Sequence, residues 1–173
     1  MLARRLTTLA LLISIAACGT ARTPEPPQPA ASPSLSAEFN AADVAFVRAL
    51  IPHHEQGIAL AELGAKATRP DVRMLTGAIV TTQRDEATRM AGWLAAWKQP
   101  PAPAPKAADL PTATGNALDR AVLTALIAHQ QEAIKLAAKE ARDGRNLNAV
   151  SLAQQIQKSR QAEIQQMRTY LAS

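Results

Sequence analysis

The chain has few of the residues that usually mark catalytic or redox sites. Only one of its 173 residues is a cysteine, Cys18, and aromatic side chains make up 3% of the total. A single cysteine excludes an internal disulfide and a thiolate metal site, so any metal ion would be held by histidine, methionine, carboxylate or amide groups. No serine or threonine is tied by spacing to a histidine and an acid. We therefore predict a protein that is not an enzyme.

The charge of the chain is positive but scattered. The formal net charge is +5, and removing Arg4 and Arg5 from the 19 basic residues leaves 17 against 14 acidic ones. The sequence contains neither a basic block nor basic residues interleaved with aromatic ones. We expect no nucleic-acid partner, because such partners are bound through clustered positive charge.

The N-terminus has the pattern of a secretory signal. Residues 1–5 are basic, and the apolar run at 6–17 is too short for a membrane span, which needs about 20 residues. Small residues precede Cys18, so we predict a signal peptide over 1–17, cleavage before Cys18 and lipidation of its thiol and amine. Residues 18–37, rich in proline, alanine and serine, are predicted to be a tether. The expected location is the cell envelope, with the protein lipid-anchored and facing the periplasm or the exterior.

The folded domain is predicted over residues 38–173, as two similar halves. The run LIPH at 50–53 returns as LIAH at 126–129, and EATRM at 86–90 returns as EIQQM at 163–167. Such repetition is typical of a duplicated structural unit. Apolar residues recur three and four positions apart, with none of the alternation that marks strands. The sequence therefore predicts an all-α four-helix bundle made of two duplicated helical hairpins.

Capping and breaking residues predict where the helices begin and end. The two halves are separated by a proline-rich linker at residues 99–112. Prolines and glycines after periodic segments indicate helix ends, whereas asparagine, aspartate and first-turn proline indicate starts. The expected helices run from a cap at Asn40 or Asp43 to about Lys66, from Pro70 to about Lys98, from about Leu118 to Arg142 before Gly144, and onward from Asn146 or Asn148.

All three histidines, His53, His54 and His129, lie in the repeated motif. Helical spacing places these rings toward the core or beside it. Pro52 lacks an N–H group, so we expect a bend there that could aim His53 or His54 at the bundle axis. The alternative is that the histidines are ordinary buried groups that form hydrogen bonds to neighbours.

Glu86 and Glu163 stand on core-facing seams, and a buried carboxylate requires a partner. An antiparallel hairpin that turns near residue 68 would place His53 opposite Gln83, with Glu86 roughly 4.5 Å further along the axis. The same count brings His129 near Glu163. The partner could be a metal ion or a protonated histidine.

Two further residue types on these seams bear on that choice. Met90 and Met167 lie further along the helix axis than the carboxylates, in the next layer of side chains. At that level we favour core packing over metal binding. Arg160 lies at the level of His129 and could satisfy Glu86 or Glu163 without any metal. The sequence leaves open whether a metal ion or Arg160 neutralises the carboxylates.

The LIPHHEQGIALA run and the Q-x-x-E-x-x-x-M-x-x-W-L run that follows it, with their echoes in the second half, resemble the ferritin-like family called domain of unknown function 305. The resemblance covers about residues 38–172 and implies an exported four-helix bundle, with copper-binding members in the cell envelope. This chain keeps the histidines and methionines that are ligand-type residues in the family, and counting residues from the hairpin turn adds the two glutamates. The predicted metal-binding set is His53, His54, Glu86, Met90, His129, Glu163 and Met167.

The chain departs from the family at several positions. Leucine stands at four positions where the family often has methionine, namely 50, 60, 126 and 136, and Gln130 replaces the second histidine of the second half. Because thioether ligands suit Cu(I), these changes weaken the case for a soft copper site. A site rich in histidine and carboxylate could still hold Cu(II), Zn(II) or another divalent ion.

We therefore expect an envelope lipoprotein that binds a transition metal, with copper as the first candidate, for storage, tolerance or delivery. The alternative is a structural or partner-binding lipoprotein with a buried His, Glu and Arg network and no metal. A di-iron carboxylate enzyme would need Glu-x-x-His motifs, and none occurs. The expected partners are the membrane, through the lipid anchor, and a metal ion; a homodimer remains open.

Overall fold

The computed structural model describes residues 38–173. They form four α-helices, α1 (Ala41–Glu62), α2 (Pro70–Ala96), α3 (Gly115–Asp143) and α4 (Leu147–Ala172), with a 3₁₀ segment at Leu63–Lys66. No strand occurs in this part of the chain. The prediction of an all-α four-helix bundle is confirmed, and the predicted signal peptide, lipidated Cys18 and tether lie outside the described residues.

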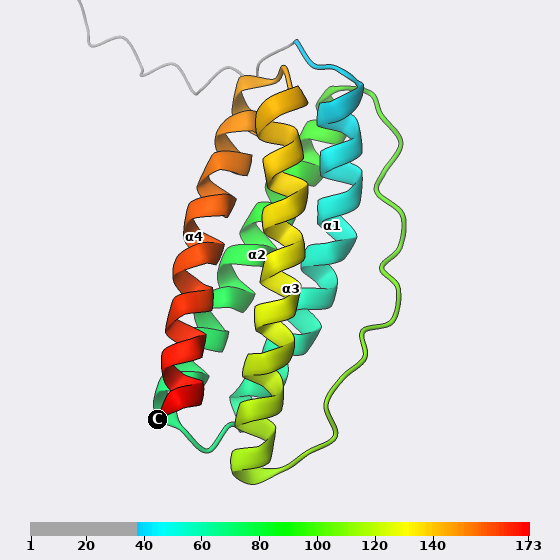
Figure 1. The fold of residues 1–173 in the computed structure, drawn as a ribbon. Helices are drawn as coiled ribbons and strands as arrows, with labels where there is room; N and C mark the ends of the chain where they lie inside the picture. The colour runs from blue at the N-terminus through cyan, green and yellow to red at the C-terminus, as the bar shows by residue number, and fades with distance from the viewer. Residues whose placement is uncertain (1–37) are drawn as a thin grey trace, which may run out of the picture. The chain divides into compact units, whose positions relative to one another are not determined.

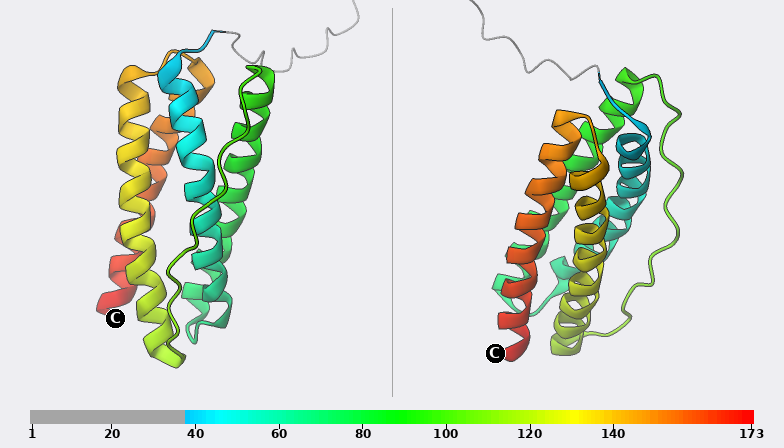
Figure 2. Two further views of the ribbon diagram at one scale, coloured as in Figure 1. Left: turned by 90° about the vertical axis from the view of Figure 1, so that its right-hand side faces the viewer. Right: turned by 45° about the horizontal axis from the view of Figure 1, so that its top comes forward.

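The helices pair as two hairpins, α1 with α2 and α3 with α4, and α1 also packs against α3. Figure 1 shows the connection between α2 and α3 running the length of the bundle, so that α2 and α3 point the same way. Figure 2 shows this linker crossing the outside of the first hairpin. Arg48 on α1 fixes it by donating to the carbonyls of Pro100 and Pro101 at 2.7 and 2.8 Å. None of the described helices is long and apolar enough to cross a bilayer.

The helix ends follow the capping chemistry of the sequence. Asn40 caps α1 and forms a capping box with Asp43, so both predicted capping residues are used. Pro70 is the first residue of α2, and Asn146 caps α4. The start of α3 is three residues earlier than predicted, at Gly115, where a φ of +59° suits glycine. Helix α1 continues through Pro52.

Two aspartates clamp the ends of the bundle. The carboxylate of Asp43, in the first turn of α1, accepts hydrogen bonds from the backbone N–H groups of Arg145 and Asn146 at 3.0 and 2.9 Å. Asp119, in the second turn of α3, accepts hydrogen bonds from those of Thr68 and Arg69 at 2.8 and 3.0 Å. Each hairpin thus supplies a carboxylate to the start of the second helix of the other hairpin, where unpaired N–H groups favour an anion.

The core consists of two apolar clusters. One cluster contains Phe46, Leu50, Met90 and Trp93 from the first hairpin together with small and aliphatic residues of α3 and α4. The other contains Leu60, Ile79, Leu126 and Met167 among its members. On every helix the buried side chains between these two clusters are polar. The candidate site lies in that interval.

Candidate functional site

A band of polar side chains, here called the central polar layer, separates the two apolar clusters. Each helix contributes two residues to it, and five of the eight are buried. A buried polar group is tolerated only where hydrogen bonds or ion pairs replace water, so the pairing within the layer determines its chemistry. The members are His53, His54, Gln83, Glu86, His129, Gln130, Arg160 and Glu163.

Arg160 lies at the centre of this layer and is completely buried. Its guanidinium donates through Nη2 to Glu86 Oε2 and through Nη1 to Glu163 Oε1, the latter at 2.9 Å. Because Glu86 is on α2 and Arg160 on α4, the ion pair joins the two hairpins. Of the partners that the sequence left open for the carboxylates, the structure therefore places Arg160 between them.

His54 and Gln130 complete the centre of the layer. The His54 Nε2 atom lies 2.8 Å from Glu86 Oε2, and the Gln130 amide donates to Glu163 Oε2. Burial lowers the pKa of His54 and outweighs the opposite effect of Glu86, so this ring is neutral at pH 7. Burial also raises the pKa of Glu163, against the influence of Arg160. The fixed positive charge in the centre belongs to Arg160.

The other two histidines form a separate pair at the edge of the layer. The rings of His53 on α1 and His129 on α3 are stacked with centroids 3.7 Å apart, and both are partly exposed. Gly57 makes room for this arrangement, because a Cβ atom there would collide with His129 and with Gln83. The stack therefore depends on a glycine one turn after His53.

Three ring nitrogens of the stack make no hydrogen bond of acceptable geometry: both nitrogens of His53 and Nδ1 of His129. The His129 backbone and the Gln130 side chain lie close enough to influence the pKa of His53 and of His129, respectively. The His129 Nε2 atom lies 2.9 Å from the carbonyl oxygen of His53, which can only accept a hydrogen bond. This contact fixes the proton on Nε2 and leaves a lone pair on Nδ1. Burial, together with the neighbouring histidines, lowers the pKa of His53 to about 3, and burial also lowers that of His129. Both rings are thus neutral at pH 7, as metal ligands must be.

The remaining predicted ligands lie elsewhere. Met90 and Met167 are fully buried, one in each apolar cluster, on opposite sides of the layer. Within residues 38–173, no three His, Cys, Asp or Glu side chains gather closely enough to hold a metal ion by themselves. The structure thus brings five of the seven predicted ligands into one layer, but divides them between the Arg160 centre and the two-histidine edge.

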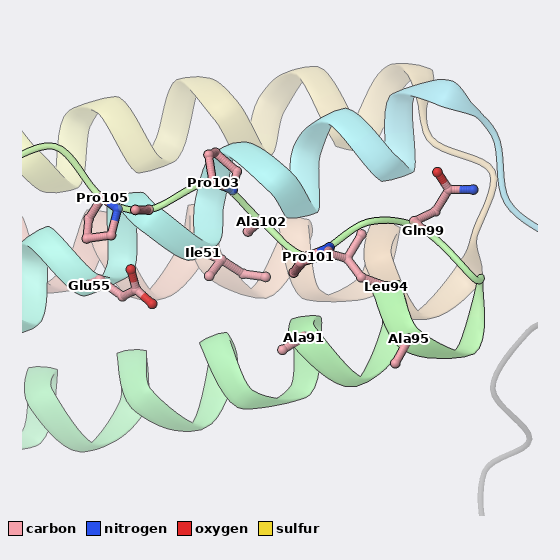
Figure 3. A pocket seen from close by; sticks show the side chains of 11 residues that line it. Ile51, Glu55, Ala91, Leu94, Ala95, Gln99, Pro101, Ala102, Pro103 and Pro105 are labelled. Atoms are coloured by element: carbon pink, nitrogen blue, oxygen red, sulfur yellow. The ribbon is translucent and has the colours of Figure 1, made fainter.

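A cavity of about 500 Å³ lies outside this layer, between α1, α2 and the linker. Figure 3 shows linker prolines, including Pro101 and Pro103, over Ile51 of α1 and Leu94 of α2. Glu55 is the one ionisable residue that lines it. An apolar lining with one carboxylate does not provide a metal site.

Comparison with known proteins places these features in a family. The family model for the domain of unknown function DUF305 matches residues 43–109 and again residues 102–171. A search of curated proteins gives no match. The two matched stretches correspond to the two hairpins, as the predicted duplication requires.

Solved structures agree with this result. A DUF305 protein from Streptomyces coelicolor, described as secreted, has 25% identity and a TM-score of 0.71, covering 76% of this chain and 91% of that one. CopM in its Cu(I)-bound form has 31% identity and a TM-score of 0.68, covering 74% and 94%. CopM has also been solved with Cu(II) and with silver.

A dodecameric thioferritin from Bacteroides fragilis shares the fold, with 19% identity, a TM-score of 0.65 and coverage of 76% and 84%. The bundle is therefore ferritin-like. Because the family model matches nearly all of residues 38–173, in two repeats, this chain belongs to the DUF305 family.

Proposed function

We propose that this protein binds a transition metal ion, with copper as the first candidate, at the His53–His129 stack. The observation that carries the proposal is the set of three unpartnered ring nitrogens in a partly buried pair of neutral imidazoles. Imidazole suits copper and zinc alike. The protein would bind its metal rather than catalyse a reaction with it.

The contact between His129 Nε2 and the His53 carbonyl supports this assignment. Metal-ligating histidines usually donate their second ring nitrogen to an acceptor, which fixes the ring orientation and the tautomer. Here that acceptor is the backbone carbonyl of His53 itself, so the hydrogen bond fixes the His129 ring beside the helix that carries the other ligand. CopM, whose match covers 74% of this chain, has been solved with copper and with silver. This similarity supports copper as the metal that the protein binds.

The biological setting is part of the same proposal. A signal peptide over 1–17 and a lipidated Cys18 would anchor the bundle to the cell envelope through the tether at 18–37. A family member from Streptomyces coelicolor is described as secreted, in keeping with a location outside the cytoplasm. Storage, tolerance and delivery of copper all require exchange with the surroundings; the stack lies at the partly exposed edge of the layer, although its unpartnered ring nitrogens are themselves buried.

Metal titration of untagged protein, followed by histidine NMR, tests the proposal. The full chain should bind Cu²⁺ with shifts in the His53 and His129 resonances, whereas His53→Ala/His129→Ala should lose most of that affinity, by at least about tenfold. His54→Gln is the matched control, because it removes a histidine but mirrors Gln130 in the other half. Equal copper and zinc affinities for the full chain and the double variant would rule out the proposal.

A second function is favoured by the Arg160 ion pairs, which satisfy the buried carboxylates without a metal. In that case the protein is a structural or partner-binding lipoprotein, and the layer serves only to join its hairpins. Thermal unfolding that does not change on adding copper or zinc, together with retrieval of a defined envelope protein, would support this function over metal binding.

A further inference from the structure

The centre of the polar layer contains two copies of one motif that differ at two positions. His54 and Glu86 in the first half correspond to Gln130 and Glu163 in the second. Gln83 in the first half corresponds to Arg160 in the second. One half therefore supplies a neutral amide where the other supplies a guanidinium, and this exchange determines the charge of the whole layer.

Arg160 uses the lone pairs that a cation would need. Glu86 Oε2 contacts both Arg160 and His54, and the two oxygens of Glu163 accept from Arg160 and Gln130. A guanidinium fully buried between two carboxylates also repels any second cation at short range. Two buried acceptors at the centre of the layer have no partner, His54 Nδ1 and Gln83 Oε1, and the latter lies beside Gly57 and the His129 ring.

We infer that Arg160 is the resident cation of this layer and that it closes a latent metal site formed by His54, Glu86 and Glu163. The guanidinium stands between the two carboxylates, so in the natural protein these side chains do not gather closely enough to hold a metal ion. Without the guanidinium, the centre of the layer would keep two carboxylates with no cation between them. Buried like charges require either protons or a counter-ion. A divalent ion with nitrogen and oxygen ligands would supply the missing charge.

This inference does not depend on the proposed function. The latent site is formed by His54 of α1, Glu86 of α2 and Glu163 of α4, whereas the two rings of the stack, His53 and His129, belong to α1 and α3. It explains why glutamates that share a layer with histidines in a bundle do not by themselves indicate a bound metal. It also predicts that the natural protein binds no metal ion at the Arg160 centre.

The test replaces Arg160 in a protein that lacks the stack. In the His53→Ala/His129→Ala background, we expect no Co²⁺ binding, as followed by visible absorption. Adding Arg160→Gln, which reproduces Gln83, should create binding of Co²⁺ at least about tenfold tighter than in the background protein. Arg160→Lys is the control that keeps a cation, and Arg160→Gln/Glu86→Gln/Glu163→Gln is the control that removes the ligands; neither should bind.

The two proposals fail in different ways. Binding by the background protein that disappears on Glu86→Gln/Glu163→Gln would show that Arg160 does not close the layer. A helical Arg160→Gln protein that binds no Co²⁺ would also overturn the inference. If Arg160→Gln unfolds, refolding that requires Co²⁺ supports the inference, and failure to refold with or without Co²⁺ contradicts it. None of these results depends on whether the natural protein binds copper at the stack.

Discussion

Among single residues, Glu140 carries a carboxyl group in surroundings that oppose its charge. It is almost completely buried near the end of α3. Burial and the neighbouring Asp43 carboxylate raise the pKa of Glu140 to about 8, with a smaller contribution from Asp143 and a lowering effect of Lys139. The folded protein therefore holds this proton more tightly than the unfolded chain, whose glutamates titrate near 4.3.

This raised pKa makes stability depend on pH in a defined direction. The contribution of Glu140 is complete below its unfolded pKa and is lost as the pH rises through about 8. The free energy of unfolding should fall by about 1 kcal/mol between about pH 7 and pH 9. The histidines, whose pKa values are lowered, change stability only at lower pH, so they do not interfere in this window.

Urea unfolding of Glu140→Gln measures the effect. The amide has no charge to titrate, so the decline between these two pH values should disappear and the variant should be the more stable protein at the higher one. Glu132→Gln, which changes an exposed glutamate paired with Lys135, should retain the wild-type decline. An unchanged decline in Glu140→Gln would assign the effect to another group.

The layer also shows what single-residue reasoning could foresee. The sequence placed His53 close to Glu86 by counting from a turn near residue 68. In the structure His54 contacts Glu86, a pairing centred on Pro70, because the 3₁₀ segment and the extended residues after it lengthen the turn. Adjacent residues on a helix point about 100° apart, so a displacement of one residue is enough to exchange the roles of neighbouring histidines.

At the scale of elements, the aspartate clamps are contacts that no local sequence pattern predicts. The capping signal gives Asp43 a role only at the start of its own helix, and Asp119, which stands 76 residues later, carries no capping signal. Local periodicity and capping signals predicted the helices and their ends to within about four residues. Which helix end receives which carboxylate depends on how the hairpins pack, and no local signal contains that information.

The Asp119 clamp can be tested by truncation. Burial alone would raise the pKa of Asp119, but hydrogen bonds from the Thr68 hydroxyl and from the amides of Thr68 and Arg69 lower it overall. Asp119→Ala leaves those donors unpaired at the start of α2 and should destabilise the protein by about 1–3 kcal/mol. Denaturant midpoints measure this loss, and Asp109→Ala, an exposed change in the linker, is the control. Equal midpoints for the two variants would show that the clamp contributes nothing.

For the whole molecule, the polar layer interrupts the core and gives the hairpins a specific alignment. Leucine, alanine and methionine clusters on either side could pack in several registers, since their shapes are similar. The Glu86–Arg160 ion pair forms only when α2 and α4 stand at one relative height, whereas the Arg160–Glu163 pair lies within α4 and holds the guanidinium in position. The hydrophobic pattern predicted the bundle, but the layer, through a single buried arginine, specifies how its halves fit.

Replacing this arginine should therefore affect the whole fold. Arg160→Met leaves two buried carboxylates without a cation, and we expect it to lose about 3–5 kcal/mol of unfolding free energy at neutral pH. Glu86→Leu/Arg160→Met/Glu163→Leu removes all three charges and should lie within about 2 kcal/mol of the natural protein, because apolar packing often replaces a buried ion triad.

Unfolding in guanidinium chloride measures the stability of the two variants and of the exposed control Arg89→Met. The comparison distinguishes an effect of lost charge compensation from an effect of side-chain volume. Charge compensation predicts that the single variant is the least stable protein and that it regains stability in acid, as its carboxylates take up protons. If Arg160→Met were as stable as Arg89→Met, the carboxylates would have to be neutralised by something other than Arg160. The alignment of the hairpins would then have to come from apolar packing alone.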